Sequence, residues 1–118
     1  MGQSPRRRIA FISEHASPVA ALGGEDAGGQ NVYVGELSRR LAQLGYAVDI
    51  FTRRSHVALP TVLDWMPGVR VIHLPAGPMT PMPKDMLWPY MPDFFQSLRT
   101  WFANPALQYD LGHGHFWM

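Results

Sequence analysis

Residues 9–52, IAFISEHASPVAALGGEDAGGQNVYVGELSRRLAQLGYAVDIFT, decide the fold, because two strand patterns flank a glycine-rich connection and a helix pattern. Ile9–Ser13 is a short apolar run of the kind that a parallel sheet buries on both faces. Ala47–Thr52 has the same character. The stretch therefore predicts a strand, a helix and a parallel strand joined by a right-handed crossover.

The helix between these strands is predicted over residues 32–44. Asn31 is suited to capping its N-terminus, and Gly45 can take the left-handed conformation that ends a helix. Its apolar residues recur at steps of three and four and form one stripe: Val34, Leu37, Leu41 and Leu44.

Outward from this unit, Val69–Leu74 follows a Pro67-Gly68 turn and predicts a third strand. A second helix is expected from Pro92-Asp93 to Asn104, and Leu111–His115 predicts a fourth strand at an open edge of the sheet. The apolar face of that helix comprises Phe94, Phe95, Leu98, Trp101 and Phe102. The fold class is α/β, a partial Rossmann-like parallel sheet of about four strands flanked by helices.

Seven of the 11 prolines fall between Pro67 and Pro92. Prolines lack the N–H that helices and central strands need, so we expect a long loop here. Its methionines and aromatic residues are too apolar for a solvated linker, and we interpret it as an ordered flap over a cleft. Lys84, the only lysine, lies in this loop and is either a solvated side chain or a clamp for a phosphate or carboxylate.

The composition narrows the classes of function. A net charge of +1 gives no reason to expect nucleic acid, and the absence of cysteine excludes disulfides and thiolate metal sites. No apolar run is long enough to span a membrane, and we expect a cytoplasmic protein in which residues 1–7 are a disordered, basic leader. No cluster of Asp, Glu or Cys lies near His113 and His115 in the sequence, so we expect no metal site.

Residues 23–31 (GGEDAGGQN) are the strongest local signal for a ligand. Glycines allow close approach to the backbone, and the free N–H groups at a helix start favour an anion such as phosphate. The spacing fits neither a P-loop nor the dinucleotide fingerprint. From the spacing alone, a tight connection without any ligand stays equally open.

Several motifs in the same order resemble glycosyltransferase family 4, especially its sucrose-phosphate synthase-like and mycothiol-pathway-like members. The resemblance runs from Arg8 to Met118, with looser stretches at 55–66 and 86–109. The motifs are SEHASP (13–18), DAGGQNVYV (26–34), VDIFTRR (48–54), PGVRV (67–71), PAGP (75–78), Pro83-Lys84 and HGHFW (113–117).

This resemblance implies two Rossmann-like domains facing a cleft, the GT-B arrangement. The N-terminal domain holds the acceptor, and the other holds most of the nucleoside diphosphate sugar, here expected to be a UDP-sugar. The implied reaction is retaining and needs no metal or other cofactor. Residues 1–118 would then be an incomplete N-terminal domain that is inactive alone, because the catalytic-region histidine and the donor-binding carboxylates have no counterpart in it.

The resemblance also implies site residues. Gly28, Gly29 and Gln30, with Asn31 beside them, match the loop that approaches the donor diphosphate and the acceptor. Lys84 matches a lysine that binds the acceptor phosphate. Phe116 stands where members with phosphorylated acceptors have tyrosine, so the resemblance does not carry a phosphorylated acceptor over to this chain. The alternative function is a non-catalytic half-domain that binds a phosphorylated ligand.

Overall fold

The computed structural model describes residues 7–13, 29–80, 86–103, 109 and 111–114, and they form one sheet with helices on both faces. The sheet has five strands in the order β3-β4-β2-β1-β5. Their bounds are β1 Arg8–Ile12, β2 Ala47–Arg53, β3 Val62–Met66, β4 Val69–Leu74 and β5 Leu111–Gly114. All neighbours are parallel except β3 and β4, which are antiparallel. The predicted Rossmann-like class is confirmed.

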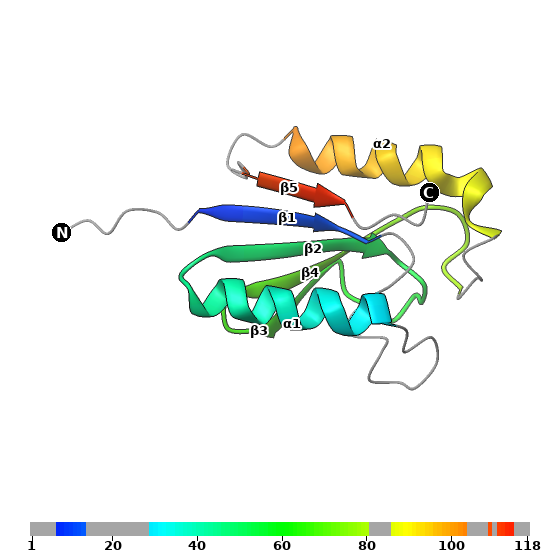
Figure 1. Cartoon of the computed structure of the whole chain (residues 1–118). Helices are drawn as coiled ribbons and strands as arrows, with labels where there is room; N and C mark the ends of the chain where they lie inside the picture. Colours follow the sequence, from blue (N-terminus) through cyan, green and yellow to red (C-terminus); the bar gives the residue numbers. More distant parts are fainter. Residues whose placement is uncertain (1–6, 14–28, 81–85, 104–108, 110, 115–118) are drawn as a thin grey trace.

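The central strands are buried on both faces, which explains their near-continuous apolar runs. In β2, Val48 and Ile50 pack in the core cluster beneath helix α1 (Gly29–Gln43). Phe51, on the opposite face, packs in the cluster beneath helix α2 (Met91–Phe102). The two helices therefore cover opposite faces of one sheet (Figure 1).

Helix α1 begins earlier than predicted. It starts at Gly29, so Asn31 is its third residue and not its N-cap. Gly45 has φ of 101° and follows the helix end, as predicted. Val34 is fully buried, and Leu37 and Leu41 pack against the same core. Leu44 is 75% exposed, so its inclusion in the apolar stripe was wrong: the helix ends at Gln43 and the chain turns away there.

Strand β3 was not predicted, and it raises the strand number to five and makes the sheet mixed. It is an edge strand whose sequence, VLDWM, is apolar at four of five positions, so it lacks the apolar–polar alternation that identifies strands, although Leu63 and Trp65 pack against the core. Gly68, with φ of 82°, closes the tight connection from β3 to β4. The Pro67-Gly68 turn therefore joins a hairpin rather than ending a loop.

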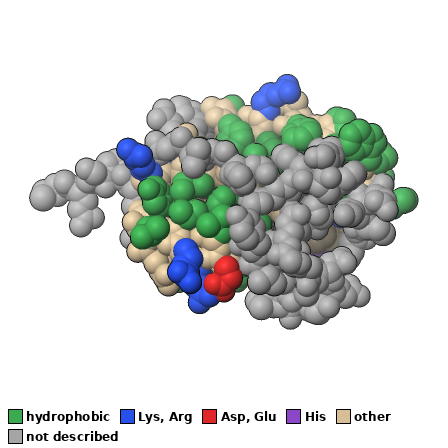
Figure 2. Space-filling view, in the orientation of Figure 1, with side chains coloured by type: hydrophobic (Ala, Val, Ile, Leu, Met, Phe, Trp, Pro, Cys, Tyr) green, Lys and Arg blue, Asp and Glu red, His purple; other side chains and the backbone are tan. Residues whose placement is uncertain are grey.

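The second helix lies close to its predicted bounds, but only part of its predicted face is buried. Phe94 and Leu98 are buried, and Trp101 is half-buried. Phe95 and Phe102 are about 40% exposed, at 39% and 40%. Apolar side chains accordingly gather along the top of the molecule, where Figure 1 draws α2 (Figure 2). Of the helices described, none is long and apolar enough to cross a membrane.

The proline-rich segment contains a short 3-10 helix, η3 (Trp88–Tyr90), directly before α2. Leu87 is buried, whereas Met86 and Trp88 are each 59% exposed. Burial therefore accounts for only part of its apolar composition. The middle of the predicted flap, residues 81–85, lies outside the described part of the chain.

Two of the expectations concern the last strand and the first residues of the chain. Within the described residues β5 pairs with β1 alone, which confirms the predicted open edge. Residues 1–6 of the predicted leader lie outside the described part. Its last residue, Arg7, is described: the Arg7 carbonyl accepts a hydrogen bond of 2.9 Å from the Ala47 N–H, and β1 begins at Arg8.

Candidate functional site

The carboxyl ends of the parallel strands meet at one edge of the sheet, which we call the carboxyl edge. It comprises the ends of β1, β2, β4 and β5. The chain passes from β1 to β2 on one side and later reaches β5 on the other side of β1. Open α/β sheets bind ligands outside the carboxyl ends of such strands, at the point where the strand order reverses. The crevice between β1 and β5 is therefore the expected site.

Helix α1 begins at this edge, because it connects two parallel strands and must run against them (Figure 1). Gly29, Gln30 and Asn31 form its first turn. The N–H groups of a first turn have no partner within the helix and carry its partial positive charge. The structure thus places these three residues in the first turn of the helix rather than in the loop before it, and their contacts with a ligand stay predictions.

The other predicted site residues lie outside the described part of the chain. They are Gly28, Lys84 and Phe116. His113 is paired in β5 opposite Phe11, and His115 lies outside the described part. The structure therefore brings Gly29, Gln30 and Asn31 to the carboxyl edge and leaves the roles of the remaining residues as predictions. No group of three or more potential metal ligands occurs among the residues described.

Sequence reasoning missed a buried arginine at the carboxyl edge. Arg53 ends β2 and is only 6% exposed. Its guanidinium donates hydrogen bonds to the carbonyl oxygens of Ala76 (3.2 Å) and Pro78 (2.6 Å), and to that of Thr80. Burial lowers the pKa of Arg53, and Tyr90 opposes this shift, but a guanidinium stays charged in proteins. A basic residue ending an apolar strand was the available signal.

His73, near the end of β4, is a second buried polar group of this region. It is 1% exposed, and its Nδ1 lies 2.7 Å from the Pro60 carbonyl oxygen. A carbonyl can only accept, so Nδ1 carries the proton and Nε2 is left as an acceptor, which has no partner among the described residues. Burial lowers the pKa of His73, the Pro60 contact opposes this, and the charge of Arg54 adds to it.

This lowered pKa predicts a pH dependence of stability. Below about pH 6.5 the unfolded chain takes up a proton that folded His73 does not, so stability should fall as the pH falls. The loss for one proton is at most about 1.4 kcal/mol per pH unit. Urea unfolding at pH values between about 7.5 and 5.5 measures it. His73→Gln should flatten the dependence, whereas the exposed His56→Gln should not; equal slopes for the two variants would contradict this account.

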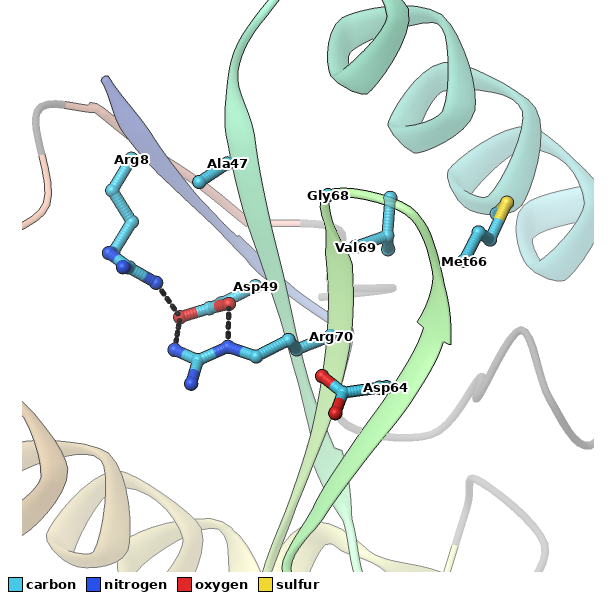
Figure 3. A pocket seen from close by; sticks show the side chains of 8 residues that line it. All are labelled: Arg8, Ala47, Asp49, Asp64, Met66, Gly68, Val69 and Arg70. Carbon is cyan, nitrogen blue, oxygen red and sulfur yellow. Dashed lines mark hydrogen bonds and ion pairs between the residues drawn. The ribbon is translucent and has the colours of Figure 1, made fainter. Parts of the chain in front are cut away.

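The opposite edge of the sheet holds a surface hollow of about 270 Å³. Arg8, Asp49 and Arg70, all near the amino ends of their strands, line it together with Asp64 of β3 (Figure 3). Arg70 binds Asp49 in a bidentate pair, at 2.8 Å from Nε and 2.7 Å from Nη2, and Arg8 Nη1 lies 3.2 Å from the same carboxylate.

This hollow is better explained as structure than as a substrate site. Asp49 is 1% exposed, and both arginines are already engaged with it. Tyr109 donates a hydrogen bond of 2.6 Å to Asp49, and Trp101 donates one of 2.9 Å to Tyr109. Burial raises the pKa of Tyr109, so its hydroxyl stays a donor. The hollow also lies at the amino ends of the strands, whereas open α/β sheets bind ligands outside the carboxyl ends.

The fold and the carboxyl edge define a Rossmann-like α/β domain in which a helix starts at the carboxyl edge of the sheet. The chain belongs to the family described as the glycosyl transferase 4-like domain, which matches residues 28–118. The resemblance noted from the motifs is thereby confirmed.

Similar proteins cover nearly all of the chain. The D-inositol 3-phosphate glycosyltransferases of Nocardiopsis dassonvillei and Kribbella flavida are 46% identical over 94% of the chain and 47% identical over 97% of it. The structure of sucrose-phosphate synthase from Thermosynechococcus elongatus matches 95% of the chain at 38% identity with a TM-score of 0.83. The chain spans 26% and 27% of the two glycosyltransferases and 28% of the synthase chain.

Proposed function

We propose that this chain forms part of the acceptor-side domain of a retaining glycosyltransferase, which moves a sugar from a nucleoside diphosphate sugar to an acceptor hydroxyl. The observation that carries this proposal is the match to glycosyltransferases along nearly the whole chain, at 46% identity for one relative. A UDP-sugar as the donor, the absence of any cofactor and a cytoplasmic location belong to the same proposal.

The geometry supports a role in binding the diphosphate. Gly29, Gln30 and Asn31 begin α1 at the carboxyl edge, where unpaired N–H groups favour phosphate oxygens. Gly28 precedes them in the sequence and belongs to the same proposed site. Val34, in the second turn of this helix, is fully buried and packs in the core cluster with the strands, which fixes the helix to the sheet.

Two residues give conflicting indications about the class of acceptor. The two named relatives act on D-inositol 3-phosphate by their names, and Lys84 suits an acceptor phosphate. Phe116 cannot donate a hydrogen bond to a phosphate. We therefore propose a polyol or sugar acceptor whose phosphate, where present, is bound by Lys84 without help from residue 116.

The direct test is an activity assay of a full-length protein that contains this chain. Incubation with UDP-sugars and with inositol, inositol phosphate or sugar phosphate acceptors should yield a glycoside of unchanged anomeric configuration. Binding of a phosphorylated ligand without any transfer, by a protein shown to be folded, would instead favour the non-catalytic half-domain. Release of UDP and NMR analysis of the product distinguish the two outcomes.

Lys84→Ala should raise the KM for a phosphorylated acceptor about 10- to 100-fold, because a hydrogen bond to a charged group contributes about 1.5–3 kcal/mol. The KM for the donor should stay unchanged. Lys84→Arg keeps the charge and is the matched control, so it should retain most of the affinity. Equal kinetics of Lys84→Ala and the unmodified protein would make Lys84 a solvated surface residue.

A further inference from the structure

The loop that follows β4 is held in place by side chains from three separate elements. Residues 75–80 (PAGPMT) leave the sheet at the end of β4. Ser97 of α2 donates a hydrogen bond of 2.7 Å to the Pro75 carbonyl. The Tyr90 ring packs so closely on Gly77 that a Cβ there would lie 2.5 Å from it, and Gly77 has φ of 69°. The start and middle of the loop are therefore tightly constrained.

Arg53 supplies the largest number of these contacts. Its guanidinium reaches three carbonyls that alternate along the loop, at Ala76, Pro78 and Thr80. No carboxylate pairs with Arg53 among the residues described, so these backbone oxygens are the compensation for a cation that is 6% exposed. A planar fork of five donors can span alternate carbonyls, which a lysine ammonium cannot.

The loop itself cannot form equivalent contacts without Arg53. Pro75 and Pro78 have no N–H, so the segment offers more acceptors than donors. The neighbouring Arg54 faces a different segment, because its guanidinium donates to the His56 and Val57 carbonyls at 3.3 and 2.8 Å. Two adjacent arginines thus bind two different loops, and of these two only Arg53 binds the loop after β4.

We propose that Arg53 is a positioning residue for the acceptor, which acts by fixing the course of residues 76–80 along the carboxyl edge. It deepens the proposed function and rests on it, because the acceptor side is assigned to this domain there. Arg53 does not touch the substrate in this proposal. It sets the backbone on which the acceptor-side wall of the crevice is built.

The kinetic test uses Arg53→Met in a full-length protein that contains this chain. Methionine has an unbranched apolar side chain but no donor, so the loop carbonyls lose their partners. The acceptor KM should rise roughly tenfold, since small misplacements of binding groups are costly, while the donor KM stays unchanged. Arg53→Lys should recover part of the loss, and Arg54→Gln, the matched control, should behave like the unmodified protein. Equal rises of both KM values, or none, would overturn the proposal.

Hydrogen exchange separates failure of this proposal from failure of the proposed function. In Arg53→Met, amide exchange measured by mass spectrometry should accelerate at least tenfold in peptides covering residues 76–80. Peptides of β2 and β4 should keep their protection, and Arg54→Gln should leave residues 76–80 unchanged. A protein without transferase activity but with this exchange pattern would refute the proposed function and retain the anchoring of the loop by Arg53. Unchanged exchange at 76–80 would refute the role of Arg53 itself.

Discussion

Asp49→Ala is expected to lower the free energy of unfolding by about 3 kcal/mol, the lower end of the range for breaking a buried ion pair. The carboxylate is 1% exposed and accepts hydrogen bonds from Arg8, Arg70 and Tyr109. Alanine removes the carboxylate, so all three donors lose their acceptor at once. The lower end of the range applies because the side chains of Arg8 and Arg70 are each 29% exposed and can be partly hydrated after the change.

Tyr109 accounts for much of the expected loss. Its hydroxyl donates to Asp49 while accepting from Trp101 of α2, so the carboxylate connects the sheet to this helix through two side chains. Without Asp49 the half-buried hydroxyl keeps its acceptor role and loses its donor role. A donor that is buried without a partner costs about 1–3 kcal/mol.

The measurement is a urea-unfolding curve, with Asp64→Ala as the matched control. Asp64 lines the same hollow from β3, but its side chain is exposed (Figure 3). Its removal should change stability by no more than about 0.5 kcal/mol. Similar losses for both variants would mean that the charge of the hollow, and not the buried network around Asp49, stabilises the fold.

The parts of the fold that were predictable are those in which the pattern is local. The β1-α1-β2 unit follows from two apolar runs and one helical stripe, and Gly45 marks the helix end because a left-handed residue is needed there. Strand β3 could not be found in the same way. Its pairing with β4 is made by the backbone, and its sequence, VLDWM, is apolar at four of five positions and so has no apolar–polar alternation.

The buried polar groups could not be predicted because their partners are distant in sequence. Asp49 binds residues 41 positions before it and 60 positions after it. Arg53 binds carbonyls 23 to 27 positions away. A charged residue inside an apolar strand indicates that a partner must exist, but only the sheet order identifies it.

In the candidate site, too, only the part with a local sequence pattern was predictable. A helix after the glycine-rich loop was predictable from the apolar stripe, but its start lies at Gly29, at the carboxyl edge, and not at residue 32. The roles of Lys84 and Phe116 came from the family resemblance alone and stay predictions. Contacts with a ligand depend on side-chain positions across a crevice, which neither periodicity nor spacing specifies.

Phe51→Ala is expected to lower the free energy of unfolding by about 4 kcal/mol, within the range for large buried aromatic residues. Phe51 is fully buried on the α2 face of β2. Its ring meets the rings of Trp101, Phe102 and Tyr109 edge to face, with centroids 5.9, 5.3 and 5.7 Å apart. Alanine would leave a cavity bordered by these three rings, two of which belong to α2. Such a loss is a large share of the roughly 5–15 kcal/mol that stabilises a typical domain.

Leu44→Ala is the matched control, because the sequence pattern assigns Leu44 to the core as firmly as it assigns Phe51. Leu44 is 75% exposed, so its truncation should change stability by no more than about 0.5 kcal/mol in urea unfolding. Phe51→Leu should lose less than Phe51→Ala, since it fills part of the cavity. Equal losses at residues 44 and 51 would mean that apolar periodicity alone determines the contribution of a side chain. A large loss at Phe51 only would show that the contribution comes from enclosure by the rings of α2 and Tyr109.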